Sequence, residues 1–195
     1  MPGRSRLVES SKCLRNQRSR GVALSSGDDP QSDVDHSRRM TTAREQIDAC
    51  KWLYLDDVRE PSDNELVIRI LEAVSGEDEI DANALDPLRE IREILRESKP
   101  IVHESGCRVF HLRWPTYIAY SVRNESYVTP DDYEDFEGRL FVKYSKSRYL
   151  DFVGSATFAT SDYPGPFDHY GIYCLNHIID VVSVSAPEIR VDKAQ

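Results

Sequence analysis

Apolar side chains recur at every second position after Cys107, and this period restricts the possible folds more than any other feature of the sequence. Because side chains alternate between the two faces of a strand, the pattern predicts a strand with one buried face. That face would carry Phe110, Leu112 and Trp114. Pro115 interrupts the pattern, and a second strand is expected from there to Asn124. Alternation of this kind is typical of antiparallel sheets.

Further elements are expected on both sides of this region. Strands are predicted at 65–72 and 140–144, and one or two more within 169–184, the most apolar stretch of the chain. Helices are predicted at about 42–55 and 87–97, and a short one after Ser145 or Ser147. Strands and helices do not alternate regularly. We therefore expect an α+β domain, with a mainly antiparallel sheet of about five or six strands and two or three helices.

Two of these helices have specific start signals. Thr42 is followed three residues later by Glu45, the spacing of a capping box, in which both side chains accept backbone N–H groups. Asp86 and Pro87 form the other start, since proline has no N–H that would be left unpaired in a first turn. The first helix is expected to end before the segment 57–63, which contains Pro61, and the second at Ser98, Lys99 and Pro100.

The first 39 residues have no hydrophobic period and are rich in Ser, Arg, Asp and Gly. Such a segment buries too little apolar surface to offset the entropy lost on ordering. We expect a disordered tail at 1–39 and a single domain at 40–195. Met40 stands directly before the first helix, so a start codon placed too early explains the tail best. A functional basic arm and an organelle transit peptide are the alternatives.

The net charge of −9 is distributed unevenly. Residues 1–20 carry +5, residues 21–39 carry −2, and residues 40–195 carry −12, which together give −9. A surface of that sign repels phosphate backbones and anionic lipid, so binding to nucleic acid or membrane is disfavoured. A basic protein is its electrostatic complement.

The four cysteines lie far apart and form no CxxC pair. This spacing excludes the common zinc ribbons and fingers and favours reduced, buried thiols in the cytoplasm. A disulfide between Cys107 and Cys174 is the alternative. No apolar run approaches the length of a membrane span, so a soluble protein is expected.

Candidate catalytic residues gather near the C-terminal end of the chain. His169, Cys174, His177 and Asp180 lie within twelve positions and would suit a metal site or a Cys–His nucleophile. On one continuous strand, however, His177 and Asp180 point to opposite faces. A structural role is the favoured interpretation, and a catalytic site formed by His177, Asp180 and Cys174 is the alternative. His111 and Glu125 are a weaker acid–base candidate.

An acidic segment with interleaved aromatic residues is the strongest candidate for partner binding. It comprises Asp131, Asp132, Tyr133, Glu134, Asp135, Phe136 and Glu137. The segment lacks the glycine and the ligand ladder of a calcium loop. A solvated loop is the simplest interpretation, but aromatic rings among acids are suited to anchoring a basic partner.

The motifs of nucleotide cofactors, zinc proteases and common esterases do not occur in the sequence, so we expect no cofactor and no metal. These features favour a non-enzymatic acidic module that binds a basic protein, for example an immunity or antitoxin-like inhibitor of a basic toxin or nuclease. A small metal-dependent or hydrolytic enzyme with its site near His177 and Asp180, and a structural subunit of a complex, are the alternatives.

Overall fold

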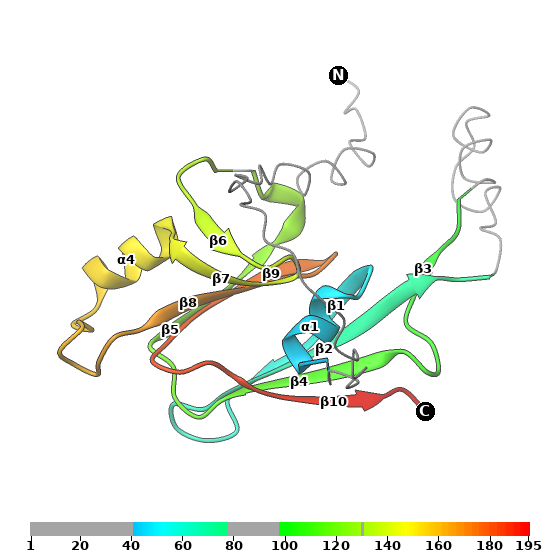
Figure 1. Ribbon diagram of the computed structural model, residues 1–195, viewed down its shortest axis with the longest axis horizontal. Coiled ribbons are helices and arrows are strands. Elements are labelled where there is room, and N and C mark those ends of the chain that lie inside the picture. The colour runs from blue at the N-terminus through cyan, green and yellow to red at the C-terminus, as the bar shows by residue number, and fades with distance from the viewer. Residues whose placement is uncertain (1–40, 78–97, 130) are drawn as a thin grey trace, which may run out of the picture. The chain divides into compact units, whose positions relative to one another are not determined.

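The computed structural model describes residues 41–77, 98–129 and 131–195. In this part, ten strands form two antiparallel sheets of five strands each (Figure 1). The expected antiparallel, sheet-rich architecture is confirmed, but the expectation of a single sheet with five or six strands is wrong. The predicted tail at 1–39 and the predicted helix at 87–97 lie outside the described residues.

The first sheet has the order β1-β2-β4-β10, with the two-residue strand β3 paired to the end of β2. Its strands are β1 Trp52–Arg59, β2 Leu66–Ser75, β3 Ile101–Val102, β4 Arg108–Trp114 and β10 Glu188–Lys193. Strand β4 follows the predicted alternation, since Phe110, Leu112 and Trp114 are fully buried.

The second sheet has the order β5-β9-β8-β7-β6. Its strands are β5 Ala119–Asn124, β6 Asp135–Glu137, β7 Phe141–Lys146, β8 Asp168–Tyr173 and β9 His177–Ser183. The turn at Pro115 therefore carries the chain from one sheet into the other. The apolar stretch at 169–184 forms two strands of a hairpin, with Tyr173 paired to Ile178.

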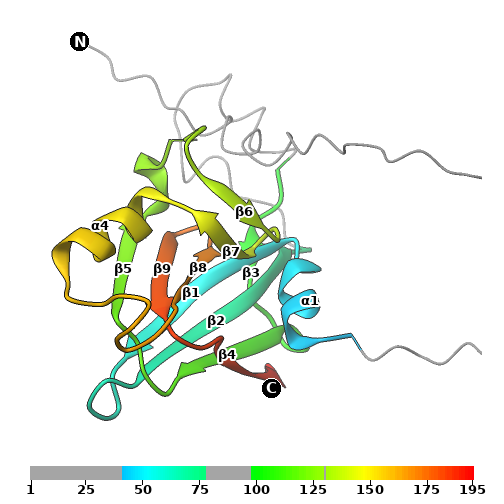
Figure 2. The same cartoon turned by 60° about the vertical axis from the view of Figure 1, so that its left-hand side comes forward.

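The inner faces of the two sheets pack together to form the main core (Figure 2). Trp114 and Phe110 come from the first sheet, and Tyr170, Ile172 and Ile179 come from the second. The ring centroids of Trp114 and Tyr170 are 6.2 Å apart. This shared core explains why both sheets have one continuous apolar face.

Two helices and one 3-10 turn are present in the described residues. They are α1 Ala43–Asp48, η2 Glu125–Tyr127 and α4 Arg148–Ala156. Thr42 and Glu45 form the predicted capping box, and Ser147 caps α4. The predicted extension of the first helix to residue 55 is wrong, because β1 begins at Trp52. No helix in the described part of the chain is long and apolar enough to span a membrane.

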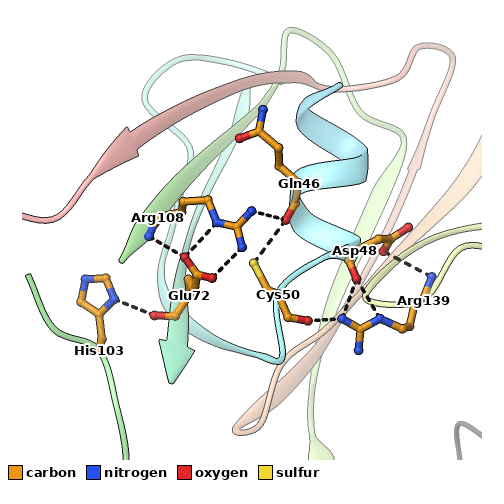
Figure 3. A network of polar contacts seen from close by, with 7 residues as sticks. All are labelled: Gln46, Asp48, Cys50, Glu72, His103, Arg108 and Arg139. Atoms are coloured by element: carbon orange, nitrogen blue, oxygen red, sulfur yellow. Dashed lines mark hydrogen bonds and ion pairs between the residues drawn. The ribbon is translucent and has the colours of Figure 1, made fainter. Parts of the chain in front are cut away.

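A polar network fastens α1 to both sheets (Figure 3). Arg108 donates to both carboxylate oxygens of Glu72, at 2.6 and 2.8 Å, and to the Gln46 carbonyl at 2.9 Å. Asp48 Oδ1 accepts the backbone N–H groups that lead into β7, including that of Leu140 at 2.8 Å. The helix thus closes one end of the main core.

Candidate functional site

The outer face of the second sheet holds a buried polar chain from a serine to an aspartate. Ser147 Oγ lies 2.7 Å from His169 Nδ1, and His169 Nε2 lies 3.1 Å from Asp180 Oδ1. Because an ionised carboxylate only accepts, Nε2 of His169 donates in this pair. All three residues are at most 1 % exposed. The serine, imidazole and carboxylate thus form a continuous chain inside the protein.

The hairpin of β8 and β9 brings His169 to Asp180. His169 is directly opposite Val182, and Asp180 is opposite Gly171, so the two polar residues are diagonal neighbours on one face. The sequence spacing of eleven residues does not reveal this contact, because it depends on the position of the turn.

Asp180 also binds two groups on β5. Arg123 Nε donates to its Oδ2 at 3.0 Å, and Ser121 Oγ donates to the same oxygen at 3.1 Å. Burial by itself raises the pKa of Asp180, but the hydrogen bond from His169 and the charge of Arg123 outweigh it and hold the pKa below its ordinary value. Asp180 is therefore an ionised and fully paired carboxylate.

Aromatic rings enclose this chain. Tyr144 stacks on His169 with centroids 4.2 Å apart, and its hydroxyl lies 2.5 Å from that of Tyr173. Gly171 makes room for this stack, since a Cβ there would lie 2.8 Å from Tyr144 and 2.8 Å from Val142. Burial, followed by the neighbouring Tyr173, raises the pKa of Tyr144.

The hydrogen-bonded series of Ser147, His169 and Asp180 resembles a catalytic triad only in its residue types. A nucleophilic serine must reach substrate, whereas Ser147 is fully buried and its oxygen accepts the Leu150 N–H at 3.0 Å as the cap of α4. The half-exposed Arg123 side chain lies against the buried carboxylate. These three buried residues therefore hold β8, β9 and α4 together, and none of them is exposed to a substrate.

The structure separates the three residues of the alternative catalytic site. Asp180 faces the buried chain, whereas His177, three positions earlier on β9, points to the opposite face, as the spacing predicts. Cys174 is buried, and burial raises the pKa of its thiol. The partner of Asp180 is His169 and not His177.

The second acid–base candidate is also divided. His111 lies on β4 in the first sheet and pairs with Asp192 at 3.3 Å, whereas Glu125 lies in η2. Burial, followed by the charge of Arg190, lowers the pKa of His111. A polar cavity of about 660 Å³ is lined by His111 and Arg69, among other residues. The positive charge of Arg69 is already paired with Asp56 at 2.5 Å.

The acidic segment, residues 131–137, is held to the domain by its first residues. Asp131 forms an ion pair with Arg148 and accepts the Tyr133 N–H at 3.0 Å. The Tyr133 hydroxyl donates to Asp151 at 2.5 Å, and Lys146 Nζ lies 3.9 Å from the ring centroid of Tyr133. Asp131 and Tyr133 therefore anchor the segment.

The last residues of the segment are presented outward. Asp132, Asp135 and Glu137 are exposed, and Phe136 is 43 % exposed. Phe136 packs edge-on against Tyr144 with centroids 5.3 Å apart, so the buried chain supports the exposed ring through Tyr144. We call Asp132, Asp135, Phe136 and Glu137 the acid–aromatic surface.

Glu134, in the middle of the segment, is partly buried. Burial raises the pKa of Glu134, opposed by a backbone hydrogen bond from Arg148 and by the charge of Arg123, and Asp180 raises it further. Unlike the exposed Asp132, Asp135 and Glu137, Glu134 is not part of the acid–aromatic surface.

Within the described residues, no group of three or more His, Cys, Asp or Glu side chains is arranged to hold a metal ion. Comparison of the chain with protein-family models, curated proteins and solved structures found no match.

Proposed function

We propose that the protein is a non-enzymatic binding protein whose acid–aromatic surface engages a basic protein partner. The observation that carries this proposal is the arrangement of residues 131–137. Asp131 and Tyr133 hold the segment from behind, while Asp132, Asp135 and Phe136 project from it. A surface organised before binding loses less entropy when a partner associates.

The charges support a basic partner. Among the described residues, no cation lies within ion-pair distance of Asp132 or Asp135. Glu137 forms an ion pair with Arg44 at 3.3 Å, but its side chain is still 72 % exposed. Phe136 would give a partner an apolar anchor among these carboxylates. The excess of acidic residues over the whole domain disfavours nucleic acid and anionic membranes as partners.

A toxin or nuclease with a positively charged cleft is the partner class that we favour. Such a cleft is shaped for phosphates, and carboxylates on a rigid edge can occupy it by charge complementarity. The protein would then act as an immunity or antitoxin-like inhibitor in the cytoplasm, where its buried thiols remain reduced.

Affinity capture with paired variants tests this proposal. The full chain is immobilised, exposed to extract of the native host at low salt, and eluted with a salt gradient. The surface variant carries Asp132→Asn, Asp135→Asn and Glu137→Gln. The control carries Asp63→Asn, Glu77→Gln and Asp162→Asn, which are exposed acids elsewhere and change the net charge equally.

A basic protein that binds the wild type and the control, and is lost from the surface variant, is the expected result. A further Phe136→Ser variant should weaken binding to the purified partner by about tenfold or more. Equal capture by the surface variant and the control, or elution of no basic protein, would refute the proposal.

A further inference from the structure

Three edges of the two sheets are protected against pairing with another strand. The β1 edge is covered by the β8–β9 turn, since Leu53 O accepts the Leu175 N–H at 2.8 Å. Strand β10 alternates charged residues, and β6 is only three residues long and includes a register shift. Short, charged or irregular strands are the usual means of preventing edge-to-edge association.

Strand β5 has none of these features. It runs six residues in regular register with β9, and its Val122 side chain is 41 % exposed. Its one charged residue, Arg123, is drawn to the outer face of the sheet by Asp180. Strand β5 is the last strand at one end of the second sheet, and α4 lies near it (Figure 2).

The ladder determines which backbone groups of β5 point outward. The Cys174 N–H bonds to the His177 carbonyl, so the backbone groups of His177, and of every second β9 residue after it, point toward β8. The backbone groups of the β9 residues between them, which include Asp180, point toward β5. In β5, the residues opposite that set point toward β9. The outward set is therefore Tyr120, Val122 and Asn124, and no hydrogen bond from their backbone to another element occurs in the described residues.

We propose that two copies of the chain pair through β5, antiparallel, about a two-fold axis at Val122. In this register Val122 faces Val122 of the other copy, and Tyr120 faces Asn124. The outward groups of all three residues are then used, which gives about six intermolecular hydrogen bonds. The two five-stranded sheets become one continuous sheet.

The side chains of β5 suit this self-pairing. The exposed valines cover each other, and β-branched pairs are favourable across antiparallel strands. Ser121 lies opposite Arg123 of the other copy, so no two like charges are directly opposed. Because a six-residue edge buries less than the roughly 1,200–2,000 Å² of a typical stable interface, the dimer should be weak and should appear as concentration rises.

Sedimentation or light scattering of the full chain over a concentration series tests the association. The expected mass rises from 22.4 kDa toward twice that value. Val122→Lys places two ammonium groups directly opposite each other and should abolish the rise. Val184→Lys is the matched control, because Val184 is 39 % exposed and lies past the end of β9. It should dimerise like the wild type.

Cross-linking tests the register. Directly opposed residues of a hydrogen-bonded pair have Cα atoms about 5.5 Å apart, within the range of a disulfide. In a Cys13→Ser background, Val122→Cys should form a reducible dimer on mild oxidation, and Val184→Cys should not. A wild type that stays monomeric, a dimer that tolerates Val122→Lys, or equal cross-linking at both positions would overturn the proposal.

Discussion

The side chain of Asn176 pairs with the backbone of Leu55 as a neighbouring strand would. Its Oδ1 accepts the Leu55 N–H at 2.9 Å, and its Nδ2 donates to the Leu55 carbonyl at 2.9 Å. The residues are 121 positions apart in the chain, and they join the β8–β9 turn of one sheet to the edge of the other. This contact satisfies backbone groups that β1 would otherwise leave unpaired.

Replacing Asn176 should loosen that connection. Asn176→Leu removes both hydrogen bonds and leaves a partly buried N–H and C=O without partners, so the free energy of unfolding should fall by about 2 kcal/mol. Urea unfolding measures the change. Asn124→Ala, which removes one exposed bond to the Ser126 N–H, should cost less than half as much. Equal losses would show that the contact with Leu55 adds nothing specific.

Breaking the buried pair of Asp180 should change the acid sensitivity of the fold. Since the folded pKa of Asp180 lies below the ordinary 3.8, its ionised form contributes stability above that pH, and the contribution is lost as the pH falls through the folded pKa. Asp180→Asn should therefore cost about 3 kcal/mol at neutral pH, and the difference from wild type should shrink below pH 4.

Urea unfolding at a series of pH values measures this change. Asp162→Asn, at an exposed site, should follow the wild-type curve within about 0.5 kcal/mol. An Asp180→Asn deficit that is constant with pH would contradict the linkage.

Two glycines should respond oppositely to the same substitution. Gly171→Ala places a Cβ 2.8 Å from both Tyr144 and Val142 and should destabilise the fold by about 1–3 kcal/mol. At Gly154, inside α4, a Cβ meets nothing within 4 Å, so Gly154→Ala should stabilise by about 0.5–1 kcal/mol through helix propensity. Thermal melting of both variants measures the contrast, and a neutral Gly171→Ala would show that Tyr144 can move aside.

The buried thiols should resist modification while the protein is folded. Burial, followed by the charge of Glu72, raises the pKa of Cys50 to about 12, and burial raises that of Cys174. In a Cys13→Ser variant, a thiol reagent at neutral pH should react with Cys50 and Cys174 only after unfolding. Rapid labelling of either residue in the native protein, located by mass spectrometry, would contradict their burial.

The sequence predicted those features that depend only on residues close together in the chain. The capping box of Thr42 and Glu45 and the alternation of Phe110, Leu112 and Trp114 needed no tertiary information. Strands β1 and β10 were not predicted. Strand β1 was missed because the helical spacing of Ile47 and Cys50 was continued into the residues that form the strand. Strand β10 was missed because it is a half-exposed edge strand with only two apolar residues, Ile189 and Val191.

Part of the candidate site could be predicted from the sequence, and part depends on the tertiary structure. The acid–aromatic surface is contiguous in the chain, and its composition alone identified the segment. The pairing of His169 with Asp180 arises from strand register, and the pairing of His169 with Ser147 arises from the position of α4, which Ser147 caps. Sequence determined the periods, caps and charge of this protein because those depend on neighbours in the chain. Only the tertiary structure decided which sheet each strand joins and which polar groups meet, because those depend on contacts between residues far apart in the chain.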